Sequence, residues 1–434
     1  MKKALIAICG VLVCSACGAP SLRYKYEVNN LAAQNKFEQA ADFVSSKRKH
    51  IYGSRDNLLY LLDKGTLLHD ANNPTSSDEL FADAQQRITD SYTKSVSAST
   101  SRLFINDLTT PYYAANYETA LTFLYRAMNF LQQQDVMSAA VEARKAVFFL
   151  DHLRGQQKKG YTDDPFVQYM ASLIFESTGE LSDARIARQN AINAYQKRGW
   201  PVPQFAVPPN ANQYGEIILL HYVGQIPLKK SQTIQLAWSK ILAFANAPVE
   251  NNGPISPEVE NAIRAGLTGS AITVSYPVLE MQPYYVTSSA VEIDGQRIPL
   301  QPMSNLAEFA AKDLEDKLPG IWFRTSTRAV LRRVAAVQAR HAIDSSSAEH
   351  HHSLGWLAGM AVDLFGATIE KADTRQWFTL PAQIYMTRIF VQPGTQNIRL
   401  LLQDGNGNII GEQKFENITV PKGGRIFLHH RTAY

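Results

Sequence analysis

The most reactive side chains of this chain are its three cysteine thiols, Cys9, Cys14 and Cys17, and all of them lie near the N-terminus. A disulfide or a cysteine-ligated metal site needs thiols within the folded part of a protein. Because the rest of the sequence contains no cysteine, we expect neither chemistry there. The chemistry that we expect of a thiol in this position is therefore covalent modification of the N-terminal region.

The residues ahead of these thiols have the pattern of a cleaved secretory signal, which we assign to residues 1–16. Lys2 and Lys3 supply the positive charge at its start, and residues 4–13 form an apolar run. This run is too short to cross a hydrocarbon core of about 30 Å. A permanent membrane helix is therefore not expected at this end of the chain.

The junction Ser15-Ala16-Cys17 resembles a bacterial lipobox, in which a peptidase cuts before a cysteine whose sulfur carries diacylglycerol. The resemblance implies that Cys17 becomes a triacylated residue, which several acyl chains hold stably in a membrane. Gly18 follows it, where an Asp would indicate retention in the inner membrane, so we expect the outer membrane, facing the periplasm. Cys14 departs from the pattern, which usually has an aliphatic residue there. Ordinary signal-peptidase cleavage near Ala16 or Ala19 is the alternative.

A second group of chemically capable side chains consists of Arg324, Arg328 and Arg332, which are four residues apart. On a helix this spacing places all three on one face. We interpret them as a candidate binding patch for lipid headgroups, peptidoglycan carboxylates or an acidic partner. The alternative is a solvated face, or pairing with the acidic residues of the preceding helix: Glu308, Asp313 and Glu315.

Trp356 is a further candidate for partner binding, because it lies in an apolar segment, residues 354–368, that holds a single charged residue. The segment is too short to span a membrane. Its glycines and alanines favour a closely packed, buried helix. The competing interpretation is an amphipathic segment that meets a partner or the membrane surface.

The histidines do not indicate a metal site. Adjacent side chains in residues 350–352 point in different directions, and only Glu349 stands beside them as a further ligand. His429 and His430 are expected on a strand, where neighbours face opposite sides. The sequence shows no phosphate-binding loop, serine elbow, His-Glu metal helix or Cys-His pair. We therefore expect no metal, no cofactor and no enzymatic activity, with a hydrolase site in the C-terminal half as the alternative.

Residues 17–198 are expected to fold as helical hairpins, because small residues recur at the spacing that lets two helices pack closely. The recurring positions are Ala127, Ala139, Ala143 and Ala146, with copies at Gly65, Ser77 and Ala84 and at Ser172, Ala184 and Ala191. This half resembles the tetratricopeptide superfamily, although its repeats lie about 45 residues apart rather than about 34. The resemblance implies an α-solenoid whose concave surface holds an extended partner. A generic array of helical hairpins is the alternative.

Residues 199–215 are expected to form a Pro-rich linker, because their prolines exclude a helix. Trp200 and Phe205 indicate that this linker packs on the rest of the protein. Residues 216–434 are expected to form an α+β domain, an antiparallel β-sandwich with inserted helices. Its predicted helices are 234–245, 307–318 with Ser304 as N-cap, and 325–341. Its predicted strands are 216–223, 271–275, 284–293, 297–300, 383–391, 398–403, 409–415 and 425–429.

The last four of these strands are separated by short turn sequences, which predict a β-meander. Before them, Asp373 and Arg375 are expected to pair, and Trp377 is expected to fill the core of the sandwich. The length of 434 residues predicts two or three domains, and the 45% of residues that are hydrophobic can supply their cores. The net charge of +4 at pH 7 gives no reason to expect nucleic-acid binding.

The segment Ala372-Asp373-Thr374-Arg375-Gln376-Trp377, together with Leu380-Pro381 and Pro393-Gly394-Thr395, resembles a family of uncharacterised bacterial lipoproteins. The resemblance covers nearly the whole chain after the signal. It implies a setting in the cell envelope, because such proteins are often encoded beside a lipoprotein similar to the curli secretion channel. It implies no catalytic mechanism.

The expectation that follows is an outer-membrane lipoprotein that acts as a protein–protein interaction scaffold in a secretion-channel or cell-wall assembly. Its expected partners are the membrane, through the lipid on Cys17, and an envelope protein such as a channel-like lipoprotein. Two alternatives remain open at this point. One is a peptidoglycan-acting or other hydrolase, and the other is a structural lipoprotein of the cell surface.

Overall fold

The computed structural model describes residues 21–95, 110–156, 161–236, 272–346 and 371–434. In these ranges the chain has an α+β fold, in which helices α2 to α9 come first and the strands come after residue 214. Cys17, Trp356, the histidines at 350–352 and the predicted helix at 354–368 lie outside the described residues. The predicted α+β class is confirmed.

In the described part of the chain, the helices before residue 199 form four consecutive pairs, and each helix contacts the next. A π-helical turn, Arg48–Tyr52, extends α3, and a short 3₁₀ turn, Ala211–Gln213, precedes the first strand. The pairs are α2 (Leu22–Ala33) with α3 (Phe37–Lys47), α4 (Asn57–Asp70) with α5 (Pro74–Ser95), α6 (Asn116–Gln132) with α7 (Val136–Gly155), and α8 (Pro165–Ser177) with α9 (Leu181–Arg198).

One turn geometry joins the two helices of every pair. The middle residue of each connection has a positive φ: Asn35 (57°), Asn72 (58°), Gln134 (61°) and Gly179 (78°). The next amide then donates to the carbonyl five residues earlier, as from Lys36 N to Leu31 O at 3.0 Å, and the other three turns repeat this bond. A left-handed residue after a helix satisfies its last carbonyls in this way. The same local device therefore sets all four hairpins.

Small residues lie at the contacts between helices, as their spacing predicted. Gly65 shows why: a Cβ added there would lie 3.1 Å from the ring of Phe81 on the partner helix, so a larger residue would push the two helices apart. The other predicted small positions are all buried: Ser77, Ala84, Ala127, Ala139, Ala143, Ala146, Ser172, Ala184 and Ala191.

Two four-stranded sheets follow, in the strand orders β10-β1-β7-β6 and β5-β4-β8-β9, together with a separate β2-β3 hairpin. β1 pairs antiparallel with β7 and parallel with β10. The bounds are β1 Gly215–Val223, β2 Leu228–Leu236, β3 Ile272–Glu280, β4 Ser288–Ile293, β5 Gln296–Pro299, β6 Gln301–Asn305, β7 Gln383–Val391, β8 Gly394–Gln403, β9 Ile409–Val420 and β10 Arg425–Thr432.

The central strand β1 is buried along its whole length, because both faces of its sheet are covered. Ile218, Leu220 and Tyr222 join a large hydrophobic cluster with the helices. The alternate residues, Ile217 and Leu219 among them, join a second cluster with β4 and β8 of the other sheet. The order of layers is therefore helices, sheet, sheet.

The predicted β-meander is wrong. Only β8 and β9 pair as neighbours, while β7 and β10 flank β1 in the other sheet, and β10 runs parallel to β1. The turn sequences correctly mark where the chain reverses, as at Gly394, which has a φ of 134°. They carry no information on which sheet the next strand joins. That choice depends on the two-sided burial of β1.

The predicted helices of the C-terminal half are also corrected. Residues 234–236 lie in strand β2 instead of beginning a helix, and the rest of the helix predicted at 234–245 lies outside the described residues. The two helices predicted on either side of Pro319 form one helix, α12 (Leu306–Ser346, 41 residues), which contains that proline. Ser304 lies in β6, and the side chain of Asn305 accepts the first-turn amide of Glu308 instead, at 3.1 Å.

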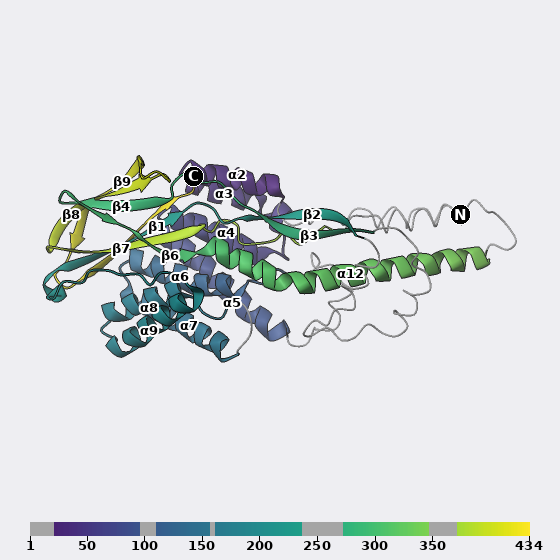
Figure 1. Cartoon of the computed structure of the whole chain (residues 1–434), viewed down its shortest axis with the longest axis horizontal. Helices are drawn as coiled ribbons and strands as arrows, with labels where there is room; N and C mark the ends of the chain where they lie inside the picture. Colours follow the sequence, from purple (N-terminus) through teal and green to yellow (C-terminus); the bar gives the residue numbers. More distant parts are fainter. Residues whose placement is uncertain (1–20, 96–109, 157–160, 237–271, 347–370) are drawn as a thin grey trace.

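An arm extends from this body. Figure 1 shows α12 and the β2–β3 hairpin running side by side away from the other elements. The two parts of the arm touch through Tyr276 of β3 and Trp322 of α12, whose ring centroids are 4.7 Å apart. The base of the arm is closed where the Ala307 amide donates to Ala382 O at 3.1 Å.

The predicted boundary at 199–215 does not separate two hydrophobic cores. The large cluster holds helical residues such as Tyr24 and Leu121 together with Ile384 and Phe427 from the sheet. The linker itself packs on this cluster through Trp200 and Phe205, as predicted. The division into 17–198 and 216–434 therefore follows the secondary structure and not the packing.

The shared turn predicts that Gln134→Gly stabilises the protein. A left-handed backbone strains any residue with a Cβ, so we expect the free energy of unfolding to rise by about 0.5–1 kcal/mol. Gly179→Ala is the opposite test, because an added Cβ would meet nothing within 4 Å there and only its φ of 78° is unfavourable. Urea unfolding should show opposite changes, and equal stability of both variants would contradict the turn assignment.

Candidate functional site

An extended segment of the C-terminal half, residues 372–380, lies against the inner side of the helices. We call it the inner segment. Its Trp377 is fully buried, and the indole Nε1 donates to Thr66 Oγ1 at 2.8 Å. The rings of Phe81 and Tyr125 each lie 5.7 Å from the indole. Trp377 was predicted to fill the sandwich core, but it packs instead in the large cluster that the helices share with the β10-β1-β7-β6 sheet.

Arg375 fixes the inner segment to the connections that precede α4 and α6. Its guanidinium bonds Asp373 as predicted, and it also bonds the buried Asp56 and the Thr110 carbonyl, both at 2.7 Å. Burial acts to lower the pKa of Arg375, but the carboxylates of Asp373 and Asp56 outweigh it and raise that pKa above its ordinary value. Removing one partner of such a pair would leave an uncompensated buried charge, which costs about 3–5 kcal/mol.

Two further ionisable groups are buried beneath the inner segment. Lys25 donates to the Thr374 carbonyl at 2.8 Å, and burial lowers its pKa to about 7. Asp63 accepts from the Phe378 amide at 3.2 Å and from the Tyr52 hydroxyl at 2.9 Å. Burial raises the pKa of Asp63 to about 8, against the opposing effects of the Tyr52 bond and of Lys25. The inner side of the helices is thus occupied by the chain itself.

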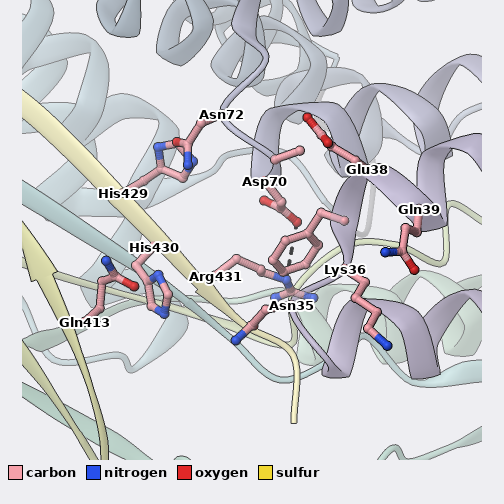
Figure 2. Close-up of a pocket in the computed structure, with 12 residues that line it drawn as sticks. Asn35, Lys36, Glu38, Gln39, Asp70, Asn72, Gln413, His429, His430 and Arg431 are labelled. Atoms are coloured by element: carbon pink, nitrogen blue, oxygen red, sulfur yellow. Dashed lines mark ion pairs between the residues drawn. The ribbon is translucent and has the colours of Figure 1, made fainter.

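A second place, which we call the junction cleft, lies where the first two hairpin turns meet the sheet (Figure 2). It is a cavity of about 440 Å³. Its walls come from the α2–α3 turn and the start of α3, from the end of α4, and from β9 and β10. The lining residues that carry polar groups include Asn35, Lys36, Glu38, Asp70, His430 and Arg431.

Asp70 and Arg431 form the buried wall of the junction cleft. The Arg431 Nε lies 3.5 Å from Asp70 Oδ2, and each side chain is only 2% exposed. Within the described residues, Arg431 Nε and Nη1 and Asp70 Oδ1 have no hydrogen-bond partner. Burial raises the pKa of Asp70 to about 7 and lowers that of Arg431, and each group partly opposes the shift of the other. Unbonded buried polar atoms are costly, so any group that bonded these atoms would stabilise this wall of the cleft.

Two histidines, His429 and His430, line the cleft beside this pair. His429 stacks on His69 with ring centroids 4.4 Å apart, whereas His430 faces the other side and stacks on His221. Burial lowers the pKa of His430 to about 4, so the ring is neutral at pH 7. Among the described residues, no group of three or more His, Cys, Asp or Glu is placed to hold a metal ion.

Among the sequence-predicted site residues, the structure describes the side chain of Arg324 alone. Arg324 is half-buried in α12, and the side chains of Arg328 and Arg332 in the same helix lie outside the described part, as do Cys17 and Trp356. The acidic residues that were considered as ion-pair partners of these arginines make other hydrogen bonds. Glu308 accepts from Trp200, Asp313 from Lys317 and Glu315 from Lys312. In the described ranges, no helix has the length and apolar character needed to cross a bilayer.

Asp70 and Arg431 were not predicted from the sequence, although the pattern of β10 indicates a buried arginine. In β10 the side chains of Phe427, His429 and Arg431 alternate toward the helices and are buried. An arginine at an inward position of an alternating strand indicates a buried charge that needs a partner. Its partner, at the end of α4, could be found only from the fold.

Comparison with known proteins adds no identification. No protein-family model matches the sequence, and the search of curated proteins found no significant relative.

The buried Asp63 predicts a pH dependence that Asp63→Asn removes. Because burial raises its pKa from 3.8 to about 8, the folded state holds a proton that the unfolded state releases between these values. Unfolding free energy should therefore fall as pH rises through this range, by at most about 1.4 kcal/mol per pH unit from this group. The wild-type slope should be more negative than that of the variant in urea unfolding. Identical slopes would show that Asp63 titrates normally.

Proposed function

We propose that this chain is a lipid-anchored protein of the outer membrane, facing the periplasm, that acts as an interaction scaffold in an envelope assembly. The lipobox-like junction before Cys17 supports the anchor. The four hairpins with a common turn support a tetratricopeptide-like array, and the cluster between the two sheets supports a sandwich-like C-terminal part. A secretion-channel or cell-wall assembly is the setting that the family resemblance implies.

The observation that carries the scaffold proposal is the position of the exposed apolar side chains. The inner side of the array is filled by the inner segment, so a partner must use another face. On α7, Met137, Val141 and Phe148 are 66%, 46% and 76% exposed. On α9, Leu181 and Ile186 are 63% and 58% exposed. Arg144 of α7 reaches Glu180 beside Leu181 at 2.6 Å, which joins the two helices into one outer face. Exposed apolar groups gathered in this way favour protein binding.

The anchor predicts that Cys17→Ser releases the protein from membranes into the soluble periplasmic fraction. The substitution removes the sulfur that would carry diacylglycerol, and no acyl chain would then be buried in the bilayer. Fractionation of cells followed by immunoblotting measures the shift. Retention of the variant in the outer-membrane fraction would contradict lipid anchoring at this residue.

The outer face predicts that a photo-crosslinking residue at Phe148 captures an envelope protein in intact cells. The same residue at Tyr285, which is 73% exposed but lies between β3 and β4, is the matched control. Mass spectrometry of the adducts should identify a partner at Phe148 that is missing at Tyr285. Equal capture at both positions would argue against the α7–α9 face as the binding surface.

A further inference from the structure

The strand β10 has an edge that pairs with no other described strand. It ends the sheet order β10-β1-β7-β6, and its only strand partner among the described elements is β1. Two cavities lie along it: the junction cleft reaches residues 429–431, and a second cavity of about 1110 Å³ reaches residues 425–428. Successive side chains of a strand point to opposite faces. Residues 425–431 all line one of the two cavities, whichever face of the sheet their side chains point to. The cavities therefore lie beside the edge of the strand and not over one face. We call these two cavities the strand groove.

The backbone groups that face the strand groove follow from the pairing with β1. Glu216 and Gly224 donate to the carbonyls of Gly424 and Thr432, so the even-numbered residues of β10 face β1. The alternate residues, Arg425, Phe427, His429 and Arg431, direct their N–H and C=O toward the free edge. Exposed edges of this kind accept an added strand.

One end of the strand groove is suited to a carboxylate. In the wall of this end, Arg431 is ion-paired with Asp70, and the buried atoms Arg431 Nε, Arg431 Nη1 and Asp70 Oδ1 make no hydrogen bond. The start of α3 also lines this end, and its N-cap residue Lys36 makes no side-chain capping bond. A helix N-terminus favours a negative charge. At the other end, Arg388 and Arg425 are already paired with Glu216.

We propose that the strand groove binds the C-terminal segment of an extended peptide, which adds to β10 as a parallel strand and places its α-carboxylate against Arg431. The peptide would run parallel to β10, as β1 does on the other side. Its last backbone N–H would then be the donor available to Asp70 Oδ1. Asp70 and Glu38 offset the charges of Arg431 and Lys36, so a single carboxylate fits this end better than a doubly charged phosphate. This site is independent of the membrane anchor and of the α7–α9 face.

The test uses the full chain in detergent and a fluorescein-labelled peptide, Thr-Val-Thr-Val-Thr-Val, with a free carboxylate. The same peptide ending in a carboxamide is the comparison. Fluorescence anisotropy should show that the carboxamide binds about tenfold more weakly, because it loses the charge-assisted bonds to Arg431. Absence of binding by the carboxylate peptide, or equal binding of both peptides, overturns the carboxylate end of the proposal.

The double variant Asp70→Asn/Arg431→Gln removes both charges together, so that no single buried charge is left. It should remain folded by circular dichroism and bind the two peptides equally. The matched control, Arg23→Gln/Glu27→Gln, removes an exposed ion pair of α2 and should keep the tenfold preference. A preference that survives in a folded Asp70→Asn/Arg431→Gln protein contradicts the role of Arg431.

Hydrogen exchange tests the strand pairing separately, and it also applies if the double variant fails to fold. In the free protein, the amides of Phe427 and His429 should exchange faster than those of Ile426 and Leu428, which face β1. The carboxylate peptide should slow the exchange of Phe427 and His429. Binding without any protection in residues 425–431 overturns the proposal.

Discussion

The burial of Arg375 between Asp56 and Asp373 is the constraint on which the rest of the arrangement depends. A guanidinium this deeply buried needs both carboxylates in place before it is tolerable. Since Asp56 precedes α4 and Arg375 precedes β7, this contact brings the helical and sheet parts of the chain together. Trp377 then fills the space between them, and β7 begins beside β1.

Around this contact the protein is arranged in three layers: the helices, the β10-β1-β7-β6 sheet and the second sheet. The helices cover one face of the β10-β1-β7-β6 sheet, and the second sheet covers the other. The inner side of a hairpin array is the surface on which repeat proteins usually hold an extended ligand. Here the chain supplies that ligand from its own C-terminal half. The surfaces that we propose for partners are accordingly the outer helices and the free edge of β10.

The parts of the fold that depend on local pattern were predictable from the sequence. The small residues at Ala139 and Ala184 predicted close helix packing, and residues 216–223 predicted a strand. Pairing between strands was not predictable, because the same turns permit β9 and β10 to join one sheet or two. For the candidate site, Arg375 with Asp373 was visible in the sequence. Asp56, Asp70 and Arg431 were not, since hundreds of residues separate these charges from their partners.

The arm is closed at its base, so its length can change in evolution without a change in the body. The chain leaves the body at Leu306 along α12 and is back in the body by the inner segment, and Ala307 and Ala382 are bonded to each other. The β2–β3 hairpin is likewise closed at its own base, where Leu228 lies opposite Glu280. Lengthening, shortening or exchanging either part would leave the ends of the body at the same separation. Related chains can therefore carry arms of different reach on an unchanged body.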